Sequence, residues 1–454
     1  MTSFLAIQEN LTSLDNRKYQ FPVHYAYDYL SGTPKYLSRP QLKVNDYLQS
    51  LRLLRLALPP SQEGQNVQRS IHAIDLFPLK AGLPWASGIL SCRQNKYWQL
   101  TLDTTKKFLE HVAADESAQM LFKPGKSISK IARNELDSNV QEGWSKFPTY
   151  LFPDGDEQRT RLLAAVNVFV FVFDDFWEMH DINAFQKVQD EFVARMQPGY
   201  IDTKNFKSDL QLLIDKTVAE ILKLDQDNGN NAGQDMLELM IRFFTRPSPP
   251  KKYTSMEEFL LYRHEDAAVP YLLGCTKFCL NSSVNLDSPR LARYIRLVKD
   301  HVSVANDLGS WQKEKKAFDI GNVLYMINAV AVTKDLFNLA SFEAAVAMTQ
   351  ALQFQIECDI DTELQQMVSE NILTAEEWQF VDATLHLISG NVFVSTVMSR
   401  YGGEDYKIPY TAARGETSQG HGSGNPHKKG NAFLRRLITF TRGLHGGRRV
   451  PLKA

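Results

Sequence analysis

Apolar residues recur at three- and four-residue intervals along most of the chain, the spacing that places them on one face of an α-helix. Segments of at least ten residues with this spacing are Tyr47–Leu58, Thr101–Ala113, Arg159–Phe176, Phe206–Leu224, Gln234–Phe244, Pro289–Lys315 and Glu343–Ser369. Few segments alternate between apolar and polar residues with the two-residue period of a half-buried strand. The pattern therefore predicts an all-α protein.

One segment is ambiguous by composition. Residues 168–173 read VFVFVF, and such β-branched and aromatic residues are also common in buried strands. The run continues Arg159–Asn167 without a turn signal, and a strand here would be isolated, so we predict a helix. Breaks such as residues 152–155 and 227–233 separate the predicted helices, but none has the length or bias of a domain linker. We expect one large helical domain.

The two ends of the chain differ from its middle. Residues 1–95 are predicted to form a partly helical N-terminal extension that packs on the main domain, which we place at residues 96–405. Residues 406–454 are rich in glycine, lysine and arginine and are predicted to be a disordered tail. Beyond residue 410 this tail carries nine Lys and Arg residues and one acidic residue. It contains a segment with the spacing of a short basic amphipathic helix, and a solvated tail without a role is an equally good interpretation.

Composition excludes several other classes of protein. The chain has 454 residues, 43% of them hydrophobic and 23% charged, which is ordinary for a globular protein. A formal charge of −1 gives no general attraction to nucleic acid. The longest apolar run is too short to cross a bilayer, and no signal peptide is visible at the N-terminus. Four scattered cysteines fit a reducing compartment, so we expect a soluble, cytoplasmic protein.

Four carboxylates follow the apolar VFVFVF run directly. Asp174, Glu178 and Asp181 are spaced to share one face of a helix, with Asp175 beside them. Like charges this close repel one another unless a cation lies between them, and carboxylate oxygens are ligands that Mg²⁺ prefers. The alternative interpretation is an acidic, solvated helix end, and this motif alone does not decide between the two.

A second polar set lies on a later predicted helix. Asn306, Ser310 and Glu314 are four residues apart and share one face, and Lys313 adjoins the last of them. An amide oxygen, a hydroxyl and a carboxylate in line are again ligands suited to Mg²⁺. A merely polar stripe is a weaker interpretation here, because the neighbouring residues are apolar and the helix is predicted to be largely buried.

Together the two sets resemble the metal-binding motifs of class I terpene synthases. The first is similar to the aspartate-rich DDxx(D/E) element, and the second matches the NDxxSxx(K/R)E element completely. Further residues match other elements of that family in order and spacing: Arg263 as a diphosphate-sensing arginine, Asp266 and Ala267 as linker and helix-break effector, and Arg400-Tyr401 as an RY pair preceded by Gly390-Asn391. The resemblance covers residues 98–405. It implies a single helical bundle of the class I terpenoid synthase type.

The resemblance also implies a reaction. Three Mg²⁺ ions, with Mn²⁺ as a substitute, would be held by Asp174, Asp175, Glu178, Asn306, Ser310 and Glu314. The diphosphate of a linear isoprenyl substrate would be bound by Arg263, Lys313, Arg400 and Tyr401. Ionisation and cyclisation would follow in an apolar cavity, giving a cyclic hydrocarbon or alcohol. The candidate cavity aromatics are Phe169, Phe173, Phe176, Trp177, Trp311 and Phe393.

Two departures from the family pattern concern the product more than the reaction. Ala267 occupies a position that is often glycine, and Val394 occupies one that is often tryptophan. Bulky Phe residues before the aspartates would shorten the cavity if they point inward, which favours farnesyl diphosphate over geranylgeranyl diphosphate as the substrate. A diterpene synthase that uses the longer substrate remains an alternative, and a homodimer is an open question.

Three other interpretations compete with this one. A chain-elongating prenyltransferase would be expected to carry a second DDxxD motif, which residues 306–314 do not provide. A helical metal-dependent phosphohydrolase could be built around His180-Asp181, with His111 or His264 completing the site. An inactive interaction protein, with the basic tail as its working part, is disfavoured by the complete second motif.

Overall fold

The computed structural model describes residues 71–401, apart from 77, 79–84, 90, 116–126, 139, 141–142, 180–181, 202–207 and 324. The predicted helix Tyr47–Leu58, most of the predicted N-terminal extension and the basic tail therefore lie outside the described residues. The His180-Asp181 pair of the phosphohydrolase hypothesis lies outside them as well.

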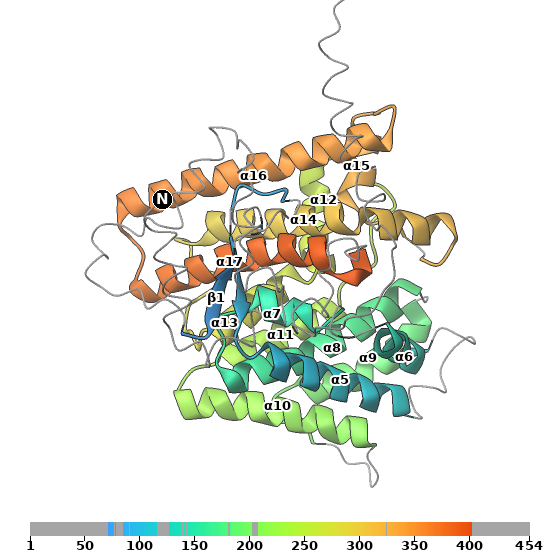
Figure 1. The fold of residues 1–454 in the computed structure, drawn as a ribbon, viewed down its shortest axis with the longest axis vertical. Coiled ribbons are helices and arrows are strands. Elements are labelled where there is room, and N and C mark those ends of the chain that lie inside the picture. The colour runs from blue at the N-terminus through green and yellow to red at the C-terminus, as the bar shows by residue number, and fades with distance from the viewer. Residues whose placement is uncertain are drawn as a thin grey trace, which may run out of the picture.

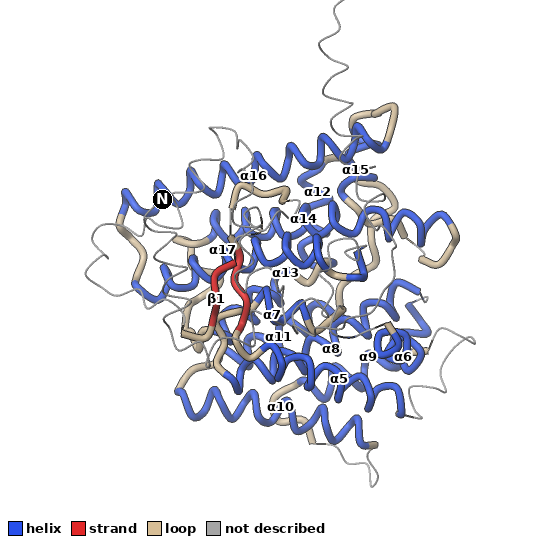
Figure 2. Tube along the Cα trace, viewed as in Figure 1, coloured by secondary structure: helices blue, strands red, loops and turns tan. Residues whose placement is uncertain are grey.

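Helices make up most of the described chain (Figure 2). They are α5 (Trp98–Ala114), α6 (Ile128–Asp137), α7 (Lys146–Leu151), α8 (Glu157–Met179), α9 (Ile182–Met196), α10 (Asp209–Asn228), α11 (Ala232–Phe244), α12 (Met256–Asp266), α13 (Val269–Cys279), α14 (Ala292–Asp319), α15 (Ala329–Leu336), α16 (Phe342–Glu370), α17 (Ala375–Val397) and the short 3₁₀ helix η4 (Ser399–Tyr401). The all-α prediction is confirmed. The VFVFVF segment is helical, as predicted, because it lies within α8.

The N-terminal part contains the two described strands, which the sequence did not predict. β1 (Ala73–Leu76) and β2 (Cys92–Asn95) pair antiparallel, with Ala73 opposite Asn95. Each strand has four residues, too few to produce a clear two-residue period. Asn95 ties the pair to the bundle, because its side-chain amide donates to the carbonyl oxygens of Pro153 at 2.8 Å and Gly155 at 2.9 Å.

Residues 85–89 are fastened to the bundle by a buried carboxylate. Glu357 on α16 is fully buried and accepts hydrogen bonds from the Ser87 hydroxyl at 2.7 Å, the Gly88 amide at 2.8 Å and His301 Nε2 at 2.9 Å. Burial acts to raise the pKa of Glu357, but these donors outweigh it and lower the pKa below its ordinary value. The contacts join the N-terminal segment to α14 and α16.

The long helix α14 runs between α16 and α17 and contacts both (Figure 1). Below these helices in the same view, α8 packs against α5, α7 and α13. One continuous apolar core joins them. Since α8 carries the first predicted motif and α14 the second, the bundle brings two segments more than a hundred residues apart toward one cavity.

Helix α17 is apolar on nearly all sides because it lies in the centre of the bundle. By length and hydropathy it is the one described helix that could cross a membrane, but 83% of that stretch is buried inside the protein. Gly390 permits a close approach to α7, since a Cβ atom there would lie 2.1 Å from the carbonyl oxygen of Tyr150. The next residue, Asn391, donates to the Val302 carbonyl on α14 at 3.1 Å. The Gly-Asn pair thus has a packing role.

Candidate active site

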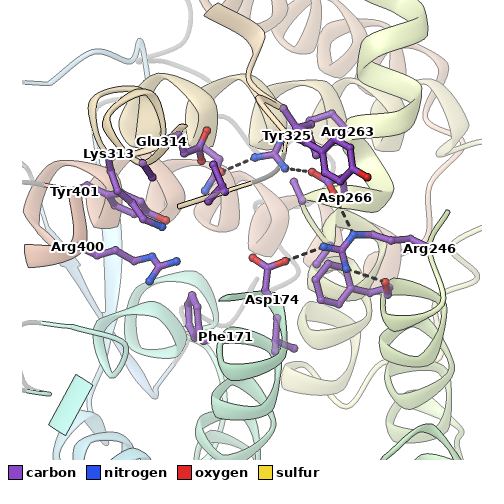
Figure 3. Close-up of a pocket in the computed structure, with 18 of the residues that line it drawn as sticks. Phe171, Asp174, Arg246, Arg263, Asp266, Lys313, Glu314, Tyr325, Arg400 and Tyr401 are labelled. Carbon is purple, nitrogen blue, oxygen red and sulfur yellow. Dashed lines mark hydrogen bonds and ion pairs between the residues drawn. The ribbon is translucent and has the colours of Figure 1, made fainter. Parts of the chain in front are cut away.

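A pocket opens where α8, α12, α13, α14, the loop after α14 and η4 meet (Figure 3). The residues predicted from the motifs that line it are Asp174, Arg263, Asp266, Ala267, Asn306, Lys313, Glu314, Arg400 and Tyr401. Lys313, Arg400 and Tyr401 lie on one side of the pocket, and Arg246 and Arg263 lie on the other (Figure 3). The fold therefore brings both motifs and four cationic side chains to one cavity.

Asp174 points into this pocket because it shares a helix face with Val170 and Phe171, which also line it. Its Oδ1 atom accepts a hydrogen bond from Arg246 Nη2 at 2.9 Å, and 31% of its side chain remains exposed. Burial raises the pKa of Asp174, and Arg246 acts in the opposite direction.

The adjacent carboxylate has a different partner. Asp175 forms a two-pronged ion pair with Arg400, in which Nη1 lies 3.0 Å from Oδ2. Burial alone would raise the pKa of Asp175, but the charges of Arg400 and Lys313 bring it below the ordinary value. This pair connects the end of α8 with η4, the last described segment of the chain.

Arg263 bonds to three side chains of the site. Its side chain is 8% exposed, and its Nη2 atom lies 2.7 Å from Asp307 Oδ1 and 3.2 Å from Asn306 Oδ1. It also pairs with Asp266, one turn further along α12. Burial lowers the pKa of Arg263, but Asp307 and Asp266 outweigh it and hold the group charged. For the Asp307 carboxyl group, burial raises the pKa to about 7, although the charge of Arg263 acts to lower it.

The second motif lies on the pocket side of α14. Asn306 and Glu314 line the pocket, while Ser310 between them is 1% exposed and its hydroxyl donates a long hydrogen bond of 3.5 Å to the Asp307 carbonyl. Glu314 is held from outside the motif, because the amide of Asn328 donates to its Oε2 atom at 2.9 Å. The same amide donates to the Asp307 carbonyl at 2.9 Å.

The predicted helix break is present between α12 and α13. Helix α12 ends at Asp266 and α13 begins at Val269. Ala268 adopts a left-handed backbone conformation with φ of 55°, which a residue with a Cβ atom rarely takes. Ala267 lines the pocket beside it. The break between α12 and α13 thus lies at the pocket wall. It directly follows Asp266, whose carboxylate pairs with both Arg246 and Arg263.

Most predicted cavity aromatics lie elsewhere. Phe169, Phe173, Trp311 and Phe393 are buried in apolar clusters and do not line the described pocket. Phe169 and Phe173 fail to reach it because Phe171, between them, occupies the pocket side of α8, and a step of two residues turns a helix by more than half a circle. The aromatic residues that do line it are Phe147, Phe171, Phe243, Tyr325 and Tyr401. The side chains of Phe176, Trp177 and Glu178 lie outside the described residues.

Three residues of the site were not predicted from the sequence. Arg246 and Asn328 lie outside every motif, in the loop after α11 and at the start of α15. Asp307 lies inside the second motif but points away from the metal-binding set, toward Arg263 and the Ala329 amide. Only Asp307 carried a signal, since an aspartate within a buried helix needs a partner.

The donor set fits a hard divalent cation. Asp174, Asn306 and Glu314 present oxygen ligands to one cavity, which is the chemistry that Mg²⁺ prefers. Among the described residues, no group of three or more His, Cys, Asp or Glu side chains is arranged around one point to hold a metal. The candidate ligands are a different kind of group, because they include the amide of Asn306 and the hydroxyl of Ser310. The aspartates of the first motif are paired with arginines.

Comparison with known proteins agrees with the geometry. Residues 165–353 match the family model described as terpene synthase family 2, C-terminal metal binding, and this region contains both motifs. The chain is also 24% identical to terpene cyclase 6 of Gibberella fujikuroi over 334 residues, which is 72% of this chain and 85% of that protein. These matches support the resemblance of the chain to class I terpene synthases. The matched family and relative are named terpene synthase and terpene cyclase, which supports an enzyme of the lyase class.

Other relatives of this chain are more distant. It is 20% identical to phomopsene synthase of Phomopsis amygdali over 56% of the chain, but the match spans only 35% of that protein. A solved structure of aristolochene synthase from Penicillium roqueforti aligns with 64% of this chain and 94% of its own, at 16% identity and a TM-score of 0.48.

Proposed function

We propose that this terpene synthase ionises and cyclises farnesyl diphosphate in a reaction that depends on Mg²⁺, and releases diphosphate. One observation carries the proposal: oxygen ligands from two distant motifs and four cationic side chains line a single pocket. We further propose that it holds three metal ions and works in the cytoplasm.

The polar part of the pocket suits the diphosphate. Arg263, Lys313, Arg400 and Tyr401 would donate to its oxygens and stabilise the negative charge that develops on the leaving group. Asp174, Asn306, Ser310 and Glu314 would hold the metal. When bound, Mg²⁺ supplies Lewis-acid stabilisation of the leaving diphosphate.

The remaining lining suits the hydrocarbon chain. Val170, Phe171, Leu272 and Phe147 form an apolar wall that would exclude water, which would otherwise capture a carbocation. Aromatic faces also stabilise a cation by about 0.5–2 kcal/mol each. Phe171 packs edge to face against Phe147 with ring centres 4.9 Å apart, and it stacks on Trp144 at 5.0 Å. Phe171 lies before the aspartates and lines the pocket, so its bulk would shorten the cavity, which favours a fifteen-carbon substrate over a twenty-carbon one.

The direct test is an incubation of the purified full chain with geranyl, farnesyl or geranylgeranyl diphosphate, with Mg²⁺ or with EDTA. We expect a cyclic terpene from farnesyl diphosphate by gas chromatography–mass spectrometry, and none with EDTA. If cyclic product formed only from geranylgeranyl diphosphate, the proposed chain length of the substrate would be wrong, but the proposed cyclisation reaction would stand. Phosphate release from all three substrates without terpene would instead support the phosphohydrolase.

Asn328 provides a second test, because it holds Glu314 without being a ligand itself. Its side chain is fully buried and its Oδ1 atom also caps α15 by accepting from the Val330 amide at 2.8 Å. We expect Asn328→Ala to raise the half-saturating Mg²⁺ concentration of turnover by about tenfold, since outer partners of metal ligands have effects of this size.

Asn328→Ser separates this effect from the loss of the helix cap. Serine can still cap α15, but its shorter side chain cannot reach Glu314 and the Asp307 carbonyl together. The serine variant should therefore keep most of the thermal stability and still show the shift in Mg²⁺ dependence. Wild-type Mg²⁺ dependence in Asn328→Ser would contradict the positioning role.

A further inference from the structure

Arg246 links the first motif to the helix break. Its side chain is 2% exposed, and its Nη2 atom lies 2.9 Å from Asp174 Oδ1 while its Nε atom lies 3.1 Å from Asp266 Oδ1. Its Nη1 atom donates to the Phe243 carbonyl at 3.2 Å, and the guanidinium lies 4.1 Å from the centre of the Phe243 ring. All three nitrogens are thus engaged, and the side chain is fixed between α8, α11 and α12 (Figure 3).

The two carboxylates that Arg246 joins would otherwise destabilise each other. Asp266 and Asp175 both act to raise the pKa of Asp174, as does its burial. A buried guanidinium between carboxylates offsets this repulsion strongly, because charges in a protein interior are poorly screened. Asp174 in this state therefore already has a cation, supplied by the protein.

We propose that Arg246 is the counter-cation that occupies Asp174 in the metal-free protein, and that it links metal binding at Asp174 to the break at Asp266. The inference rests on the proposed role of Asp174 as a metal ligand. A divalent cation at Asp174 must displace the arginine or bind beside its positive charge, and either course lowers the affinity for the metal. Once Arg246 loses Asp174, Asp266 remains as its carboxylate partner, next to Ala267 and the left-handed Ala268.

The test measures Mn²⁺ binding to the full chain without any diphosphate, by the electron paramagnetic resonance signal of the free ion. We expect Arg246→Gln to lower the dissociation constant by about tenfold or more. Arg242→Gln is the matched control, because Arg242 lies one turn earlier, is 58% exposed and pairs with Glu265 rather than Asp174. This control should bind Mn²⁺ as the wild type does.

Two further variants separate the inference from the proposed function. Asp174→Asn should weaken Mn²⁺ binding, and in that background Arg246→Gln should have little additional effect. If Asp174→Asn binds Mn²⁺ as the wild type does, the metal role of Asp174 is wrong. If Asp174→Asn weakens binding but Arg246→Gln leaves it unchanged or weaker, the counter-cation role alone is overturned. Failure to detect binding in both the wild type and Arg246→Gln overturns it as well.

Arg246→Lys covers the case in which the glutamine variant does not fold, as judged by circular dichroism. Lysine keeps the charge but lacks the planar fork that reaches Asp174 and Asp266 together. We expect it to bind Mn²⁺ about threefold more tightly than the wild type does. Affinity equal to or below that of the wild type would contradict the proposal.

Discussion

Glu314→Ala is expected to lower terpene formation by at least about 100-fold, the loss typical when a group that stabilises transition-state charge is removed. Glu314 is the last oxygen ligand of the α14 set, it lines the pocket, and Asn328 fixes its carboxylate. Asn306→Ala should have a similar effect, because the two side chains serve the same metal in the proposed site. The measurement is the initial rate of product release at saturating Mg²⁺.

Two control variants, both expected to stay active, test whether the loss is specific to the proposed metal ligands. Lys315→Ala changes the residue next to Glu314 on α14. The Lys315 ammonium lies 2.6 Å from Asp319 and does not line the pocket, so this variant should keep near-normal activity. His180→Ala should also keep most of the activity. Inactivation by His180→Ala together with an active Glu314→Ala variant would reject the synthase and favour the phosphohydrolase.

Arg263→Ala is expected to destabilise the folded protein by about 3–5 kcal/mol and to abolish cyclisation. The large loss follows because Asp307, which is fully buried, and Asp266, which is 5% exposed, would lose the cation and the hydrogen bonds that they share, and would leave carboxyl groups without this partner in the interior. Unfolding by urea, followed by circular dichroism, measures the stability. Arg242→Ala is the comparison, because Arg242 is 58% exposed on α11 and its ion pair with Glu265 on α12 should contribute less than about 1 kcal/mol.

A double variant checks the stated cause. Arg263→Met with Asp307→Asn removes both charges, so it should be more stable than Arg263→Met alone, although it remains inactive. If Arg263→Ala unfolds at the same urea concentration as Arg242→Ala, the buried ion pairs do not contribute as the structure indicates.

Part of the site could be predicted from sequence because its residues are periodic on single helices. Asn306 and Glu314 share a face of α14 by spacing alone, and the complete second motif carried the resemblance to class I terpene synthases. The cavity aromatics could not be predicted in this way. Phe169, Phe171 and Phe173 are the same residue type and have similar neighbours in the sequence. Only the packing of α8 against α5 and α13 decides that Phe171 lines the pocket.

The sequence by itself therefore predicted the helical class, the resemblance to class I terpene synthases and the candidate metal ligands, because each of these depends on residue types and on their spacing along the chain. The tertiary structure alone decided how the charges pair. Arg246 and Asp174 are 72 positions apart, and Arg400 and Asp175 are 225 apart. No local pattern encodes such contacts, since they arise only when the packing of the apolar faces has placed the helices and the loops that join them.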